Sequence, residues 1–318
     1  AHLIAKEKGS DIEEAVAKAI PLLKGAYTFA MMTENSLIGV RDPYGIRPLS
    51  LARIEGGGYV LASETCAFDT IGAEFIRDIQ PGEMIVIDSN GMRSRNIVPS
   101  KGKALCIFEY IYFARPDSNI EGRNVHLVRK ELGRQLAREH SIEADIVTGV
   151  PDSSIAAASG VAEEMGLPYE VGLIKNRYIG RTFIQPTQKI RELGVKLKLN
   201  PVKKIVEGKR VIMVDDSIVR GTTSMRIVQM LKNAGAKEVH VRISSPPVKD
   251  CCYYGIDTSK PSELIANRMS VAEIGRAIGA DSIGFLSFEG MLSAIGLEDK
   301  KSCLSCFDSC YPVKPEVD

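Results

Sequence analysis

The sequence contains no tryptophan, only four histidines, and no apolar run close to the ~20 residues that a membrane-spanning helix needs. Its formal net charge is +1, from 41 basic and 40 acidic residues. That balance gives no general electrostatic reason for nucleic acid or an anionic membrane as a partner. A basic and apolar leader is also lacking. We therefore expect a cytoplasmic, globular protein that binds neither nucleic acid nor membrane.

The length of the chain bounds its domain organisation. With 318 residues, 44% of them hydrophobic, the chain can form two domains that each bury a core. Its first residue is Ala1, which lies within an apparent apolar helix. This start predicts a fragment, or a processed product, whose upstream part is missing.

Residues 1–100 read as a helix followed by short β-strands. Ser10 and Glu13 form a capping-box pattern that predicts a helix from about 11 to 24. Turn residues then separate short apolar runs, which predict an antiparallel meander and one half of a layered α+β domain. The polar stretch 100–103 is the expected domain boundary. The runs are 26–32, 36–42, 49–54, 59–64, 83–88 and 92–98.

Residues 101–318 show a different pattern of predicted elements, because strands and helices alternate from about residue 125. This order predicts an α/β domain with a parallel sheet and helical crossovers, followed by a cysteine-rich tail. The expected strands are 145–150, 169–174, 210–214 and 238–245, and the expected helices lie near 128–136, 155–166 and 224–234.

The segment VIMVDDSIVRGTTS, residues 211–224, combines acidic and phosphate-binding chemistry. Two carboxylates end an apolar strand, where open α/β sheets bind ligands, and can accept ribose hydroxyls or approach Mg²⁺. A helix start rich in glycine and hydroxyls offers donors to a phosphate. Considered separately, the Asp-Asp pair is also typical of a turn, and the Thr-Thr-Ser run is also typical of a helix cap. The expected ligand contacts are Asp215, Asp216, Gly221, Thr222, Thr223 and Ser224.

This segment resembles the phosphoribosylpyrophosphate (PRPP) signature of the type I phosphoribosyltransferases. Further segments resemble one family within that group, the glutamine PRPP amidotransferases, and they follow one another in that family's order over nearly the whole chain. They are DPYGIRPLS (42–50), ASETCAFD (62–69), EYIYFARPDSNIEG (109–122), GVPDSS (149–154), LIKNRYIGRTFIQP (173–186), SSPPV (244–248) and YYGID (253–257).

The resemblance implies a two-part enzyme that starts purine synthesis. An N-terminal-nucleophile glutaminase domain supplies ammonia, and a phosphoribosyltransferase domain joins it to PRPP to form 5-phosphoribosylamine. Residues 1–100 resemble only the second half of the glutaminase, so its nucleophile has no match here. Cys66 lies inside ASETCAFD, away from the nucleophile position, and is expected to be a packed core thiol. Homo-oligomers and inhibition by purine nucleotides are also implied.

The resemblance also implies roles for three further residues of the transferase site. Ser154 would join Asp215 and Asp216 at Mg²⁺, although its segment could equally be an ordinary helix cap. Lys175 and Arg177, with Arg181 as a further candidate, would lie on a loop that closes over the diphosphate of PRPP and excludes water. A solvated basic loop is the alternative interpretation of these three.

Seven cysteines in a cytosolic chain favour metal binding or catalysis over disulfides. The spacing of Cys303 and Cys306 suits two ligands of one metal centre. The resemblance implies a structural [4Fe–4S] cluster, and its ligands would be Cys106, Cys252, Cys303 and Cys306. Cys251 is one residue out of register and Cys310 is additional. A zinc site with the same ligands, or free thiols, remain open.

Two alternatives to the enzyme follow from the same residues. One is a non-catalytic regulator that senses PRPP or a nucleotide, although a DNA-binding module with basic helices is not evident. The other is a fragment that does not fold, because half of a glutaminase sandwich leaves an apolar face uncovered.

Overall fold

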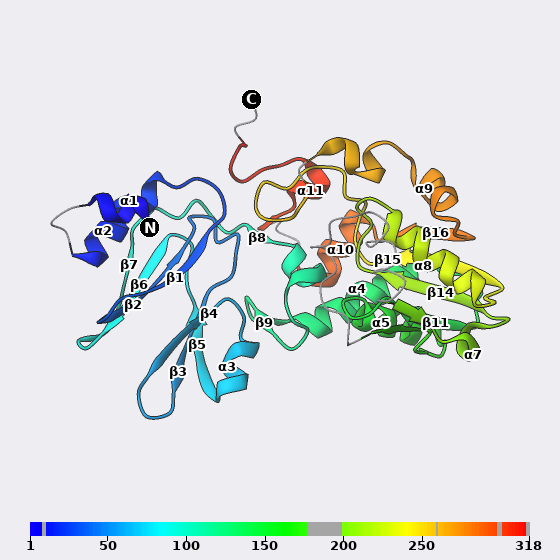
Figure 1. Ribbon diagram of the computed structural model, residues 1–318, viewed down its shortest axis with the longest axis horizontal. Helices are drawn as coiled ribbons and strands as arrows, with labels where there is room; N and C mark the ends of the chain where they lie inside the picture. Colours follow the sequence, from blue (N-terminus) through cyan, green and yellow to red (C-terminus); the bar gives the residue numbers. More distant parts are fainter. Residues whose placement is uncertain (8–10, 177–198, 259, 298–300, 316–318) are drawn as a thin grey trace. The chain divides into compact units, whose positions relative to one another are not determined.

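The structure is a computed structural model that describes residues 1–7, 11–176, 199–258, 260–297 and 301–315 (Figure 1). It divides into two compact units, which we call unit 1 and unit 2. Unit 1 comprises Ala1–Val125, Cys251–Ser259 and Asp299–Asp318, and unit 2 comprises His126–Asp250 and Lys260–Glu298. The functional boundary at 100–103 stays a prediction. In the described part of the chain, no helix has the length and apolar character needed to cross a membrane.

Residues 28–96 of unit 1 form two antiparallel sheets, where the sequence predicted a single meander. Their strand orders are β1-β2-β6-β7 and β4-β3-β5. Helix α3 (Cys66–Ile71) and strand β5 (Ala73–Asp78) were not predicted. The other strands of the two sheets are β1 (Thr28–Met32), β2 (Ser36–Arg41), β3 (Ser50–Ile54), β4 (Tyr59–Ala62), β6 (Glu83–Asp88) and β7 (Gly91–Asn96).

Strand β6 is apolar on both of its faces because both are covered. Met84 belongs to the cluster formed with helix α2 (Ile12–Ala19), whereas Ile85 packs with Leu51 of the second sheet. Successive side chains of a strand point to opposite faces, so an unbroken apolar run is what a sheet covered on both sides requires.

Helix α2 begins one residue later than its predicted capping box. Asp11, not Ser10, is the N-cap, and its side chain accepts a hydrogen bond of 2.8 Å from the Glu14 N–H. The helix then tightens into a 3₁₀ turn at Ile20–Leu22. Carboxylates and hydroxyls are both good N-caps, so adjacent candidates such as Ser10 and Asp11 leave the first residue ambiguous.

The remaining elements of unit 1 are short. A two-stranded parallel pair joins β8 (Leu105–Cys106) to β17 (Ser302–Cys303), although the two strands are far apart in sequence. The other elements are helix α1 (His2–Lys6), the π-helical turn η2 (Glu109–Phe113), β9 (Asn119–Ile120), β10 (Arg123–Asn124) and α11 (Ser305–Asp308).

Unit 2 contains a parallel sheet, as predicted, although its strand β16 (Ser282–Phe285) was not among the predicted strands. Its strands are arranged in the order β11-β14-β15-β16, and every neighbouring pair is parallel. The prediction at 169–174 was partly wrong. Tyr169 makes only an isolated bridge to Val147, and the strand that follows pairs antiparallel outside the sheet. The strands are β11 (Ile146–Gly149), β12 (Leu173–Lys175), β13 (Leu199–Pro201), β14 (Arg210–Asp215), β15 (Glu238–Ile243) and β16 (Ser282–Phe285).

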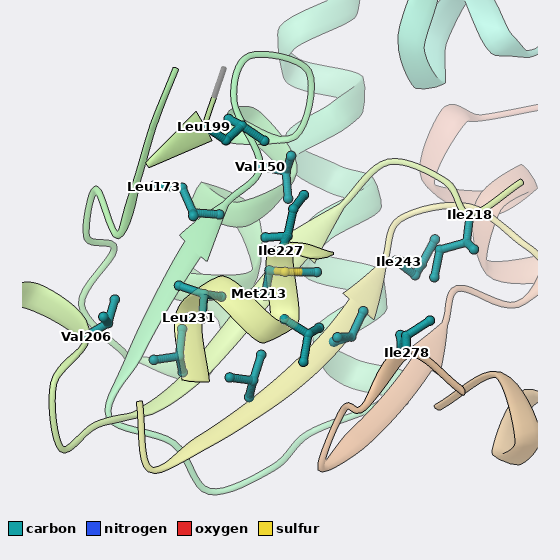
Figure 2. Packing of buried hydrophobic residues seen from close by; sticks show 14 of the residues in the cluster. Val150, Leu173, Leu199, Val206, Met213, Ile218, Ile227, Leu231, Ile243 and Ile278 are labelled. Atoms are coloured by element: carbon teal, nitrogen blue, oxygen red, sulfur yellow. The ribbon is translucent and has the colours of Figure 1, made fainter. Parts of the chain in front are cut away.

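One core cluster fixes helices α8 (Thr222–Asn233) and α9 (Val271–Ile278) to this sheet. Figure 2 shows Ile227 and Leu231 of α8 lying over Met213 of β14. The central strands β14 and β15 are therefore held in place beside the loops that follow them. The other helices of the unit are α4 (Val125–Glu139), α5 (Ile155–Met165), α7 (Lys203–Val206) and α10 (Phe288–Ile295), with 3₁₀ turns at Pro261–Glu263 and Ile265–Asn267.

Helices α4 and α5 approach each other closely enough to require glycine. A Cβ added at Gly133 would lie 1.9 Å from the Ala157 carbonyl oxygen, and one at Gly160 would lie 1.9 Å from the Lys130 carbonyl oxygen. Both neighbouring atoms belong to helical backbone, which cannot move aside as a side chain can. Two glycines thus set the distance between the helix that follows β11 and its partner.

We expect Gly160→Ala to destabilise the chain by roughly 2–3 kcal/mol, because overpacking at the backbone outweighs the ~1 kcal/mol that alanine gains in helix propensity. Chemical denaturation followed by circular dichroism measures the change. Ser159→Ala, on the same helix, is the matched control and should be nearly neutral. A Gly160→Ala chain as stable as the wild type would show that the two helices separate easily.

Candidate active site

The site is built from the loops after two neighbouring parallel strands, β11 and β14. Because the strands are parallel, their carboxyl ends meet at one edge of the sheet, where open α/β sheets bind ligands. Asp215 is the last residue of β14, and its carbonyl oxygen accepts a 2.9 Å hydrogen bond from the Ser244 N–H after β15. The backbone of Asp215 is therefore fixed at the end of the sheet.

The serines of the β11 loop donate to the carboxylates of the β14 loop. Ser154 Oγ donates to Asp215 Oδ1 over 3.1 Å, and Ser153 Oγ donates to Asp216 Oδ2 over 2.5 Å. Ser217 Oγ also donates to Asp216 Oδ1, over 2.6 Å. The structure thus brings Ser154 together with both predicted acids, and Ser153 takes part equally.

The two carboxylates lie in an environment that disfavours their ionisation. Asp215 is 8% exposed and Asp216 is 7% exposed. Burial, followed by the charge of Asp216, raises the pKa of Asp215 well above its usual range. Burial also raises the pKa of Asp216, while hydrogen bonds from serines and the charge of Arg129 oppose that rise. A cation bound between these carboxylates and a ligand would relieve their repulsion.

A loop of tight backbone geometry connects the acids to helix α8. Gly221 is the N-cap residue of α8 with φ of +79°, in the left-handed region that favours glycine. Lacking a side chain, it cannot cap the helix, so the first N–H groups of α8 have no side-chain cap and are suited to bind an anion. The hydroxyls of Thr222 and Thr223 are exposed, whereas the Ser224 side chain is buried. Ser224 would therefore act through its backbone.

The predicted basic loop is described only at its start. Lys175 ends β12, and its ammonium group forms an ion pair with the Asp152 carboxylate of the β11 loop. The structure thus brings Lys175 to the same loop as Ser153 and Ser154. Arg177 and Arg181 lie outside the described residues.

Sequence reasoning did not select Asp152 or Arg129, and it named Ser153 only as a neighbour of Ser154. Asp152 and Ser153 could have been found, because they share the turn after β11 with Ser154. Arg129 has no local signal, since it lies on helix α4 and its charge reaches Asp216 only through the tertiary fold.

The four predicted ligand cysteines share one neighbourhood in unit 1, although they come from three distant segments. Cys303 pairs with Cys106 across the β17–β8 ladder. Cys306 lies on α11, and its side chain interacts electrostatically with those of Cys106, Cys252 and Cys303. Burial raises the pKa of the Cys106, Cys303 and Cys306 thiols.

The environment of Cys252 is polar on one side. Its Sγ accepts hydrogen bonds from the N–H groups of Tyr254, at 3.3 Å, and Ile256, at 3.5 Å. Cys310 is exposed, and Cys66 is buried on α3. Within the described ranges, no three His, Cys, Asp or Glu side chains converge as ligands of one metal ion.

Two family models match separate parts of the chain. The model of a glutamine amidotransferase domain matches residues 2–70, and that of a phosphoribosyl transferase domain matches residues 121–245. The second match includes both acids, the β11 loop and the start of α8. The site described above therefore lies in the part of the chain that is similar to phosphoribosyltransferases.

Several relatives are similar over nearly the whole chain. An amidophosphoribosyltransferase of Bacillus subtilis is 56% identical over 99% of this chain and 67% of its own length. One from Mycobacterium tuberculosis is 52% identical, covering 96% of this chain and 58% of its own length. The chloroplastic amidophosphoribosyltransferase 1 of Arabidopsis thaliana is 51% identical, covering 99% of this chain and 56% of its own length. The chain thus spans between 56% and 67% of these three relatives.

Solved structures agree with the sequence comparisons. The structure of glutamine PRPP amidotransferase from B. subtilis complexed with ADP and GMP superposes with a TM-score of 0.91 at 55% identity. The match covers 98% of this chain and 70% of that one. A second structure, described as the allosteric regulatory enzyme of purine biosynthesis, gives the same TM-score and identity and is covered to 68%.

The buried acids predict a pH-dependent stability in the absence of metal. Because their folded pKa values are raised, their contribution to stability is fully present below the ordinary pKa of about 4 and is lost as pH rises through the folded values. We expect Asp215→Asn to raise the thermal midpoint near pH 8 by roughly 2–4 °C, and less near pH 4. Differential scanning calorimetry measures both. Glu143→Gln, which removes an exposed carboxylate of unit 2, is the control, and an equal shift at both pH values would contradict the assignment.

Proposed function

Because the chain belongs to the amidophosphoribosyltransferase family, we propose that unit 2 transfers the 5-phosphoribosyl group of PRPP to ammonia. The products are 5-phosphoribosylamine and diphosphate, in the first step of purine synthesis. One observation carries this proposal, the buried Asp215–Asp216 pair at the end of β14 beside the open start of helix α8. This arrangement suits a sugar that carries hydroxyls at one side and a phosphate at the other.

The carboxylates bind and orient the ribose. Asp215 and Asp216 accept hydrogen bonds from its hydroxyls, and their negative charge stabilises the positive charge that develops on the ring as the bond from C1 to diphosphate breaks. Ser153 and Ser154 hold the carboxylates in place through the hydrogen bonds described above. Ammonia is small and neutral, so it needs little recognition.

The helix start binds the 5-phosphate. The N–H groups of Thr222, Thr223 and Ser224 point along the axis of α8, and the two threonine hydroxyls add donors. Glycine is required at position 221, since its φ of +79° disfavours other residues and a Cβ there would lie 2.7 Å from Ile265 Cδ1. Phosphate is thereby fixed at one end while the diphosphate end reacts.

The diphosphate end requires positive charge. The adjacent buried carboxylates and the Ser154 hydroxyl fit Mg²⁺, a cation that prefers oxygen ligands and is commonly shared with substrate phosphates. When bound there, Mg²⁺ supplies charge stabilisation to the leaving diphosphate. Lys175, and Arg177 on the segment beyond the described residues, add cationic donors to the same group.

In this proposal, residues 1–100 belong to the domain that releases ammonia from the amide group of glutamine. Residues 101–318 form the domain that transfers the phosphoribosyl group. The match of residues 2–70 to the glutamine amidotransferase model supports that division. Cys66 is buried on α3, so we assign it a packing role. We therefore do not assign Cys66 as the nucleophile that releases ammonia from glutamine.

We infer that the four neighbouring cysteines hold a [4Fe–4S] cluster rather than one zinc ion. A zinc ion requires four ligands that converge at about 2.3 Å from a single point. A cluster places each sulfur on a different iron, so its sulfurs lie farther apart. The electrostatic contacts of Cys306 with the three other thiols support such a set, Cys106, Cys252, Cys303 and Cys306.

Three further properties complete the proposal. Purine nucleotides inhibit the enzyme, an idea supported by a relative's structure in complex with ADP and GMP. The protein forms homo-oligomers, and it acts in the cytoplasm. The family also includes a chloroplastic member, so the compartment is specific to each relative.

The transferase activity is tested with PRPP, Mg²⁺ and ammonium ion. We expect the purified chain to release diphosphate, and Asp215→Asn to lower kcat/KM by about 100-fold or more, because a group that stabilises the transition state is neutralised. A coupled diphosphate assay measures this, and Glu143→Gln should match the wild type. A folded chain that binds PRPP but releases no diphosphate at high ammonium would indicate a sensor.

The metal centre is tested by composition. Protein purified without oxygen should contain about four iron and four sulfide ions per chain and absorb in the visible range. Cys306→Ser should lose this iron, because one of the four ligands is removed. Cys310→Ser changes an exposed thiol on the same tail and should retain it. One zinc per chain without sulfide would overturn the cluster.

A further inference from the structure

Arg47 is a half-buried cation held in a fixed orientation inside unit 1. Its Nη1 donates to Glu109 Oε1 over 2.8 Å, and its guanidinium carbon lies 4.6 Å from the centre of the Phe113 ring. The Arg47 side chain is 23% exposed and that of Glu109 is 7% exposed. An ion pair and an aromatic face thus leave the guanidinium little freedom to turn.

The chain around the fixed guanidinium is close to two of the proposed cluster ligands. On one side, the Cys106 N–H donates to the carbonyl oxygen of Ile46, the residue before Arg47, over 2.9 Å. On the other side, a Cβ added at Gly255 would lie 2.7 Å from Arg47 Nη2. Gly255 sits between the two N–H groups that donate to Cys252 Sγ. The charge of Arg47 interacts electrostatically with both cysteine side chains.

We propose that Arg47 is a positioning residue whose positive charge offsets the negative charge of the four-cysteine cluster. Glu109 holds the Arg47 side chain in place, and the negative charge of Glu109 reduces that offset. The inference rests on the proposed [4Fe–4S] cluster. Four thiolates carry more negative charge than the positive charge of the cluster they bind, and a buried excess of one sign is costly. A fixed guanidinium beside two of the sulfurs offsets that excess.

A purely structural role for the Arg47–Glu109 pair makes a different prediction. If the pair only holds the fold together, removing either partner breaks the same salt bridge, and both variants should weaken the site alike. If charge at the cluster matters, the variants should act in opposite directions. Arg47→Gln removes the stabilising charge. Glu109→Gln removes the opposing charge but keeps an amide oxygen that can accept the hydrogen bond from Arg47, so Arg47 stays in place.

The experiment follows iron transfer from the full chain, purified without oxygen, to a ferrous chelator. We expect Arg47→Gln to release iron roughly tenfold faster than the wild type. Glu109→Gln should release it more slowly or at the wild-type rate. Arg47→Lys keeps the charge and should restore most of the retention. Arg95→Gln removes an exposed, ion-paired arginine of the same unit and is the matched control.

Each outcome decides a separate point. Faster release from both Arg47→Gln and Glu109→Gln overturns the electrostatic role and leaves a structural salt bridge. Unchanged release from Arg47→Gln overturns any role. Where Arg47→Gln holds too little iron to follow, Glu109→Gln decides, because only a structural pair predicts faster release. A wild-type chain without iron and sulfide overturns the cluster itself, and the role of Arg47 with it.

Discussion

The mutual repulsion of Asp215 and Asp216 is the constraint on which the transferase site depends. Two adjacent carboxylates are each less than a tenth exposed, so ionising both costs free energy unless hydrogen bonds or a cation stabilise their negative charge. Serine hydroxyls from the β11 loop supply part of that compensation. A cation and a polyhydroxylated ligand would supply the rest. The carboxylate pair therefore carries an electrostatic cost that a bound cation would reduce.

The scaffold of unit 2 is organised to hold this unfavourable pair in place. The parallel ladder between β11 and β14 brings the two loops together, and the core around Met213 and Ile227 fixes strand β14 and helix α8 (Figure 2). The glycine contact between α4 and α5 anchors the helix that follows Ser154. A rigid sheet edge is suited to a site whose selectivity depends on charge, because its groups do not need to reorganise during the reaction.

Unit 1 uses a different principle, since its cysteines are gathered from distant segments. Cys106, Cys252 and Cys303 meet only because strand β17 pairs with β8 and the Cys252 turn packs beside Arg47. A group bound there would cross-link these three segments. Ligand placement and charge balance are thus both properties of the tertiary structure in this unit.

The sequence alone determined the parallel α/β character of residues 125–245, the acidic pair and the glycine–threonine helix start. These signals are local, because each depends on residues within one turn, strand or loop. The sequence missed β5, placed the cap of α2 one residue early, and read two sheets as one meander, since strand pairing depends on distant partners. Only the tertiary structure decided that Ser153 donates to Asp216, that the charge of Arg129 reaches Asp216, and that Arg47 interacts electrostatically with two cysteines. Such contacts are set by packing between elements far apart in the chain, which no local pattern encodes.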